Sequence, residues 1–173
     1  MSNKVTYNSD LHCVMKNEDV KLSPLKENYR AVLYVAASDP NIWEQHPVRD
    51  RWKKDVYDLF FDTALDCNLA FVVHDTITGA CIGSSRYRFH NTEDYAIEIG
   101  WTFLVVSHWG GKYNRAIKQL MIDNAHRYYT DVMLYIDANN IRSIRAAEKI
   151  GAVRLTDQDD PLYDTRTNYL SFL

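Results

Sequence analysis

The sequence predicts a mixed α/β fold in which helices cover both faces of a central, mostly antiparallel sheet. Three observations support this class. Short runs of alternating apolar and polar residues, bounded by turn residues, are typical of half-buried strands. Longer segments between them carry apolar residues at helical spacing. The first strands follow one another in hairpin order, and a later strand–loop–helix–strand unit adds a parallel pair.

The N-terminal part is predicted to contain two strands and a helix. Residues 11–15 and 20–25 indicate two short strands joined by a polar turn at residues 17–19. Residues 27–37 indicate a helix, which we expect to end before Pro40 because proline disfavours helical backbone in the residue before it.

The middle of the chain is predicted to contain a second helix, a hairpin and a long strand. Residues 50–65 indicate the helix. Its expected apolar side consists of Trp52, Val56, Leu59, Phe60 and Thr63. Residues 69–74 and 80–89 indicate a hairpin that turns at Gly79, and the alternating run at residues 96–105 indicates the next strand.

A glycine loop at residues 105–115 connects this strand to a third helix. The apolar face of that helix consists of Ile117, Leu120, Met121, Ala125 and Tyr128. Gly110 and Gly111 let the backbone turn tightly and approach a ligand. The helix start presents unpaired N–H groups and the positive end of the dipole, which suits a phosphate or pyrophosphate. Many strand–helix turns contain glycine and bind nothing. The glycines therefore leave open whether this is an anion-binding loop or only a turn, and the surrounding elements decide between the two.

The C-terminal part is predicted to add a strand, a helix and a final strand pair. Residues 132–136 indicate the strand, and residues 142–150 a short amphipathic helix that stops at Gly151. The final pair is expected near Val153 and at residues 168–172. We interpret residues 1–173 as one globular domain, because 173 residues with 46% hydrophobic content form a sizeable core.

Three motifs carry a family resemblance. They are E-I-G-W-T-F-L at residues 98–104, W-G-G-K-Y-N-R at 109–115 and N-x-x-S-x-R-A-x-E-K-I-G at 140–151. Together they resemble the GNAT superfamily of acyl-CoA-dependent N-acyltransferases, most of all the branch that includes the ribosomal-protein N-terminal acetyltransferases. The resemblance covers about residues 20–155. It implies the same mixed sheet, with two parallel strands that splay apart near Leu104 and hold the cofactor between them.

The resemblance implies acetyl-CoA as the acyl donor, and the spacing of the histidines and cysteines indicates no metal site. The residues that the resemblance places at the cofactor are Phe103, Leu104, Gly110, Gly111, Lys112, Tyr113, Asn114, Arg115 and Asn140. A backbone amide near Phe103 or Leu104 is expected to bind the oxyanion. Asn140 is also a good helix N-cap, and the sequence leaves both roles open.

Acetyl transfer requires a base, because the ammonium form of an amine cannot attack a thioester. Glu98 is the expected base: it alternates with apolar residues and should share a face with Gly100 and Thr102. The alternative is a solvated or salt-bridged strand glutamate. Ser143 lies in a helix first turn, where N–H groups favour a nearby thiolate. Its alternative role is local hydrogen bonding only.

The chain departs from the family pattern at two places. The pyrophosphate loop is usually R/Q-x-x-G-x-G/A, and here Trp109, Lys112 and Asn114 occupy the first, middle and last defined positions. Lys112 either contacts phosphate directly or indicates a shifted loop. Many family members carry a tyrosine that reprotonates the CoA thiolate. Ala147 occupies that position, which leaves Ser143 as the nearest alternative donor.

The acceptor is expected near Trp43 and His46, in the link between the first two helices, which lines the acceptor pocket in the family. Charge supports the enzyme hypothesis: residues 108–154 hold eight Lys/Arg against four Asp/Glu. The formal net charge is −3, so the rest of the chain is acidic and suits an approaching amine. The negative total argues against a nucleic-acid binder.

The remaining features indicate a cytoplasmic protein. The cysteines Cys13, Cys67 and Cys81 have no metal-site spacing and are expected to be reduced thiols. No apolar run approaches the roughly 20 residues that span a membrane, so no membrane partner is expected. The oligomeric state stays open, with a homodimer as one option.

The sequence therefore predicts acetyl transfer from acetyl-CoA to a primary amine, by direct attack in a ternary complex. The acceptor is expected to be a small molecule or a peptide or protein N-terminus. The alternative is a non-catalytic acyl-CoA-binding or sensing module with the same fold.

Overall fold

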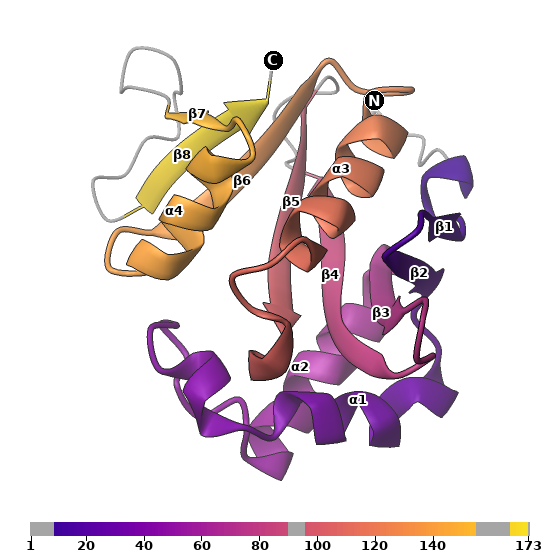
Figure 1. Cartoon of the computed structure of the whole chain (residues 1–173). Helices are drawn as coiled ribbons and strands as arrows, with labels where there is room; N and C mark the ends of the chain where they lie inside the picture. Colours follow the sequence, from indigo (N-terminus) through magenta and orange to yellow (C-terminus); the bar gives the residue numbers. More distant parts are fainter. Residues whose placement is uncertain (1–8, 90–95, 155–166, 173) are drawn as a thin grey trace, which may run out of the picture.

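The computed structural model describes residues 9–89, 96–154 and 167–172, with strands that form one mixed sheet (Figure 1). Their order is β1-β2-β3-β4-β5-β6-β8-β7, and only β5 and β6 pair in parallel. The strands are β1 (Met15–Lys16), β2 (Val20–Pro24), β3 (Ala70–Asp75), β4 (Cys81–Phe89), β5 (Ala96–Leu104), β6 (Asp131–Asp137), β7 (Val153–Arg154) and β8 (Thr167–Phe172). The predicted class is confirmed.

Helices cover both faces of the sheet (Figure 1). The α-helices are α1 (Arg30–Ala37), α2 (Lys54–Asp66), α3 (Tyr113–Ala125) and α4 (Ile141–Lys149). The 3-10 turns are η1 (Ser9–Leu11), η2 (Glu27–Tyr29), η3 (Pro40–Trp43) and η4 (Val106–His108). Helices α1 and α2 pack on one face, while α3 and α4 pack on the other.

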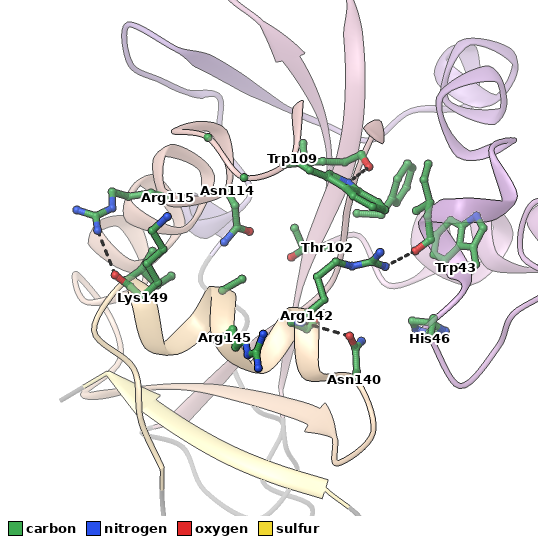
Figure 2. A pocket seen from close by; sticks show the side chains of 18 residues that line it. Trp43, His46, Thr102, Trp109, Asn114, Arg115, Asn140, Arg142, Arg145 and Lys149 are labelled. Atoms are coloured by element: carbon green, nitrogen blue, oxygen red, sulfur yellow. Dashed lines mark hydrogen bonds between the residues drawn. The ribbon is translucent and has the colours of Figure 1, made fainter. Parts of the chain in front are cut away.

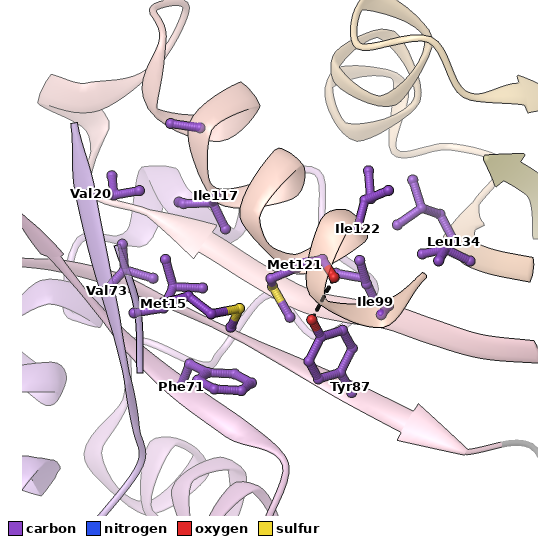
Figure 3. Close-up of a cluster of buried hydrophobic side chains, with 14 of the residues drawn as sticks. Met15, Val20, Phe71, Val73, Tyr87, Ile99, Ile117, Met121, Ile122 and Leu134 are labelled. Carbon is purple, nitrogen blue, oxygen red and sulfur yellow. Dashed lines mark hydrogen bonds between the residues drawn. The ribbon is translucent and has the colours of Figure 1, made fainter. Parts of the chain in front are cut away.

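The side-chain alternation of β3 divides the core between these two faces. Phe71 and Val73 point toward α3, whereas Val72 packs with α1 and α2. On the α3 face the buried Tyr87 hydroxyl donates to the backbone oxygen of Met121 at 2.6 Å (Figure 3). This bond satisfies a polar group inside the apolar layer and fixes α3 on the sheet.

Two predicted elements differ from the structure near the N-terminus and in α2. Residues 11–15 were expected to form a strand, but only Met15–Lys16 pairs with β2, and Leu11 ends a 3-10 turn. The Asn124 side chain of α3 donates to the Leu11 oxygen at 3.0 Å, a long-range bond that local alternation does not encode. In α2, Leu59 is 67% exposed, and the buried side instead consists of Tyr57, Phe60, Phe61 and Ala64.

The parallel strands β5 and β6 separate soon after they begin. Their register contains three pairs, which end at Glu98 opposite Met133. Beyond these pairs β5 continues to Leu104 and β6 to Asp137 without pairing to each other. The predicted splayed pair is therefore present.

A β-bulge in β5 changes which side chains face this opening. Arg86 lies opposite Gly100 and Ser84 opposite Phe103, so β5 holds one extra residue. Trp101 adopts a left-handed backbone with φ of 52°. Beyond the bulge the alternation is shifted, and the Thr102 side chain points to the α3 face. The expectation that Glu98, Gly100 and Thr102 share a face is wrong for Thr102.

Candidate active site

Two adjacent cavities occupy the opening between β5 and β6. The larger cavity has a volume of about 310 Å³ and the smaller about 200 Å³. Seven residues line both of them: Trp43, His46, Thr102, Asn114, Asn140, Ser143 and Ala146. The shared walls mean that a ligand in one cavity can meet a ligand in the other.

The larger cavity collects most of the predicted cofactor residues. Those that line it are Phe103, Leu104, Gly110, Gly111, Asn114, Arg115 and Asn140. Gly110 has φ of 71°, a left-handed conformation that favours glycine, and α3 begins three residues later. The basic residues Arg115, Arg145 and Lys149 also line it, and Figure 2 shows Arg115 and Lys149 close together at one end. A helix start beside three cations suits a phosphate-bearing ligand.

Two predicted cofactor residues lie elsewhere. The Lys112 ammonium forms an ion pair with Asp19, and the Tyr113 hydroxyl donates to Asp75 at 2.8 Å. Neither lines a cavity. Hydrogen bonds from the Thr78 backbone and then the Tyr113 hydroxyl hold the pKa of Asp75 well below its usual range. These contacts tie the start of α3 to the β2–β3 edge, so in this structure Lys112 has an intramolecular partner in place of a phosphate.

Asn140 caps α4 and lines both cavities. Its side-chain oxygen accepts the Ser143 backbone N–H at 3.2 Å, so the N-cap role is confirmed. Ser143 lies in the first turn of α4 and also lines both cavities. Ala147, one turn further along α4, lines the smaller cavity, where the family tyrosine is missing.

Glu98 lies in the sheet beside the site but not on a cavity wall. Glu98 is 4% exposed, and its carboxylate pairs with the Arg88 Nε at 3.0 Å. It occupies the space over Gly100, where an added Cβ would lie 2.9 Å from its Oε1. The structure thus has the salt-bridged glutamate that the sequence left as an alternative.

Lys118 is a site residue that the sequence analysis missed. It is 7% exposed, lines the smaller cavity, and donates from Nζ to the Thr102 hydroxyl at 2.6 Å. Thr102 in turn lies 2.7 Å from the Ser85 hydroxyl. Burial lowers the pKa of Lys118 to about 7, although the negative charge of Glu98 raises it. The sequence did contain a signal for this buried lysine, because Lys118 lies beside Ile117 and near Met121 on the apolar side of α3.

The link between α1 and α2 forms the wall opposite α4. Trp43 is buried, and its Nε1 donates to the Ala37 oxygen at 2.8 Å. The His46 Nδ1 accepts the Val48 backbone N–H at 2.9 Å. Burial, followed by the charge of Arg51, lowers the pKa of His46 to about 4, so the ring is neutral at pH 7. Trp43 and His46 line both cavities, where the acceptor was expected.

Arg142 connects the two walls of the larger cavity. Its Nη2 donates to the Ile42 oxygen at 2.7 Å, and its guanidinium lies 4.1 Å from the centre of the Trp109 ring (Figure 2). One side chain of α4 thereby contacts both η3 and the glycine loop.

The acidic acceptor side that the charge distribution suggested is not found at the smaller cavity. Its charged lining residues are Arg51, Lys118 and Asp137. Within residues 9–89, 96–154 and 167–172, no group of three or more His, Cys, Asp or Glu side chains could hold a metal ion. Over the same residues, no helix has the length and apolar character needed to cross a membrane.

Several solved structures with similar folds are named as acetyltransferases. A probable GNAT-family acetyltransferase from Chromobacterium violaceum has a TM-score of 0.78 at 21% identity, covering 94% of this chain and 86% of that chain. A GCN5-related N-acetyltransferase from Brucella melitensis has a TM-score of 0.75 at 20% identity, with coverages of 94% and 79%. The microcin C7 self-immunity acetyltransferase MccE, solved with acetyl-CoA and AMP, has a TM-score of 0.73 at 13% identity, with coverages of 91% and 93%.

No curated protein matches the chain at a significant level. The family model of the acetyltransferase (GNAT) domain matches residues 19–153. That range contains every residue that lines the two cavities. The sequence match, the splayed strands and the glycine loop agree, and the chain therefore belongs to the GNAT acetyltransferase family.

Proposed function

We propose that this protein transfers an acetyl group from acetyl-CoA to a primary amine by direct attack in a ternary complex. The observation that carries the proposal is the pair of adjacent cavities, which share walls at Thr102 and Ser143. The larger cavity suits the donor and the smaller the acceptor. The acceptor is a small molecule or a peptide or protein N-terminus; the resemblance to the ribosomal-protein branch supports the latter option. We expect the reaction to occur in the cytoplasm.

The larger cavity fits the parts of an acyl-CoA in order. The start of α3 and the cations Arg115, Arg145 and Lys149 suit the phosphates. Phe103 and Leu104 at the end of β5 supply apolar surface for the pantetheine arm. The first turn of α4 at Ser143 offers a hydroxyl and the positive end of the helix dipole, both of which stabilise a departing thiolate.

Proton transfer is assigned to Lys118 together with Glu98. Neutral Lys118 accepts a proton from the acceptor ammonium, and the free amine then attacks the thioester carbon. As the C–S bond breaks, the Lys118 ammonium returns that proton to the thiolate, and the second amine proton leaves to water. A group with a pKa near 7 suits both halves of this step. Glu98 acts through its charge on Lys118, or as the base through water.

Thermal unfolding with acetyl-CoA tests the donor site. Ligand at about 100 times its Kd should stabilise the protein by roughly 2.7 kcal/mol, a rise in Tm of about 5–10 °C. Adenosine 3′,5′-bisphosphate, which lacks the pantetheine arm, should shift Tm far less. The absence of a shift at millimolar acetyl-CoA would refute the donor site.

The second candidate is a non-catalytic acyl-CoA-binding or sensing module. Ala147 and the glycine-loop departure at Lys112 favour it, because they remove a proton donor and a loop glycine. A screen of primary amines for release of free CoA separates the two. Turnover that Glu98→Gln or Lys118→Met reduces, with the acetyl-CoA Tm shift retained, identifies an enzyme. A Tm shift without turnover of any amine identifies a sensor.

A further inference from the structure

In the segment that follows η3, Arg51 lines the smaller cavity and has no carboxylate partner among the described residues. Arg51 is partly buried and lines this cavity. Its guanidinium stacks on aromatic rings, 4.7 Å from the centre of Phe60 and 5.4 Å from Trp43. Among the residues that the structure describes, none forms an ion pair with Arg51. Burying an uncompensated charge is costly, so such a site favours an anion from outside the chain.

A second guanidinium increases this positive charge. Arg86 of β4 is 9% exposed and lies 3.8 Å from the centre of the Trp101 ring, which lines the smaller cavity. Its buried Nε has no hydrogen-bond partner within the part of the chain that the structure describes. Burial and then the charge of Arg86 lower the pKa of Arg51 to about 10, so Arg51 stays protonated near pH 7. Burial lowers the pKa of Arg86, although Cys67 and then Glu98 raise it.

His46 and Arg51 present two donors to each other. The backbone N–H of Val48 donates to the His46 Nδ1, so in the neutral ring the hydrogen is on Nε2. The Arg51 Nη1 lies 3.1 Å from that Nε2. Two N–H groups at this distance do not bond to each other. An oxygen with free lone pairs, placed to one side of the pair and within hydrogen-bond distance of each nitrogen, would accept from both.

We infer that the acceptor amine carries a carboxylate, which Arg51 and His46 bind at the wall of the smaller cavity. The planar guanidinium fork matches the two carboxylate oxygens. A cavity of about 200 Å³ suits an acceptor of amino-acid or dipeptide size. The positive charge of Arg51 disfavours a polyamine there. The inference rests on the proposed acetyl transfer and narrows its acceptor to small anionic amines.

Matched amines test this inference in the wild-type protein. The panel contains α-amino acids and dipeptides, each with its carboxamide and its decarboxylated amine, and phosphoethanolamine as a phosphate arm. CoA release is measured at saturating acetyl-CoA. We expect kcat/KM for the best carboxylate to exceed that of its amide by tenfold or more. An amide or decarboxylated amine that reacts as well overturns the carboxylate site but leaves acetyl transfer standing. A preference for phosphoethanolamine also overturns the carboxylate site. If none of the amines causes CoA release, the proposed enzyme activity itself is overturned.

Variants then assign the site to Arg51. Arg51→Gln should lower kcat/KM for the carboxylate by about tenfold to hundredfold, mainly through KM, as expected for a lost charged hydrogen bond. Its values for the amide and decarboxylated amine should stay within twofold of wild type. Arg49→Gln, an exposed arginine of the same loop, is the matched control. An equal loss for all three amines would show that Arg51 serves folding rather than recognition and would overturn the assignment.

Discussion

Replacing Lys118 by methionine is predicted to stabilise the protein, and more at low pH than at high pH. Burial lowers the pKa of Lys118 from 10.5 to about 7. Between these values the unfolded chain binds more protons than the folded chain, so the stability of the wild type rises with pH. The difference corresponds to about 5 kcal/mol of destabilisation at pH 6 and about 2 kcal/mol at pH 9.

Methionine has a similar length and no charge, so it removes this pH-dependent cost. It also removes the hydrogen bond to the Thr102 hydroxyl, a loss of about 1 kcal/mol at every pH. Lys118→Met should therefore exceed the wild type by about 4 kcal/mol at pH 6 and by about 1 kcal/mol at pH 9.

Urea unfolding of both proteins at pH 6, 7.5 and 9 measures this difference. Lys26→Met, at an exposed position before η2, is the control and should change stability little at any of these pH values. A difference between Lys118→Met and the wild type that does not vary with pH would refute the lowered pKa. In the acetylation assay the same variant should lose about 10²-fold or more of kcat, the usual contribution of a general acid–base residue.

Three other substitutions test the strand packing, the α4 cap and the Asp75 hydrogen bonds. Gly83→Ala should prevent native folding, as seen by circular dichroism, because its Cβ would lie 2.0 Å from the Phe103 backbone oxygen; a native spectrum and an unchanged melting curve would contradict the β4–β5 packing. Asn140→Ala should cost about 1 kcal/mol in urea unfolding through loss of the α4 cap, and should weaken acetyl-CoA binding by calorimetry. Asp75→Asn should lower stability at pH 7 and should lower it clearly less near pH 2. The reason is that hydrogen bonds depress the pKa of this carboxyl, so its stabilisation is present above about pH 4 and is lost as the pH falls. Equal destabilisation at both pH values would contradict that account.

Local sequence patterns were sufficient to predict most of the fold. Alternation located β2, β4 and β5 to within a residue or two, because these strands bury one or both faces in the core. The N-cap at Asn140 was also readable, since capping depends on neighbours three residues away. The glycine loop was identifiable because Gly110 and Gly111 immediately precede a helical pattern.

The features that the sequence did not reveal depend on contacts between distant segments. The bulge at Trp101 arises from the register of β5 against β4, and it moves Thr102 to the face of α3. Lys112 pairs with Asp19 because α3 packs beside the turn between β1 and β2, a contact that no local pattern encodes. The burial of Lys118 likewise follows from the position of α3 over the opening in the sheet.

The short pairing of β5 with β6 has a consequence for the dynamics of the molecule. Three residue pairs join the half-sheet β1–β5 to the half-sheet of β6, β8 and β7, so few hydrogen bonds resist their separation. In native-state hydrogen exchange we expect amides of β6 and α4 to open at a lower free energy than those of β3 and β4. A ligand that spans the opening would bridge the two halves and make their exchange cooperative. Substrate binding in this opening would then join the two half-sheets into one cooperative unit.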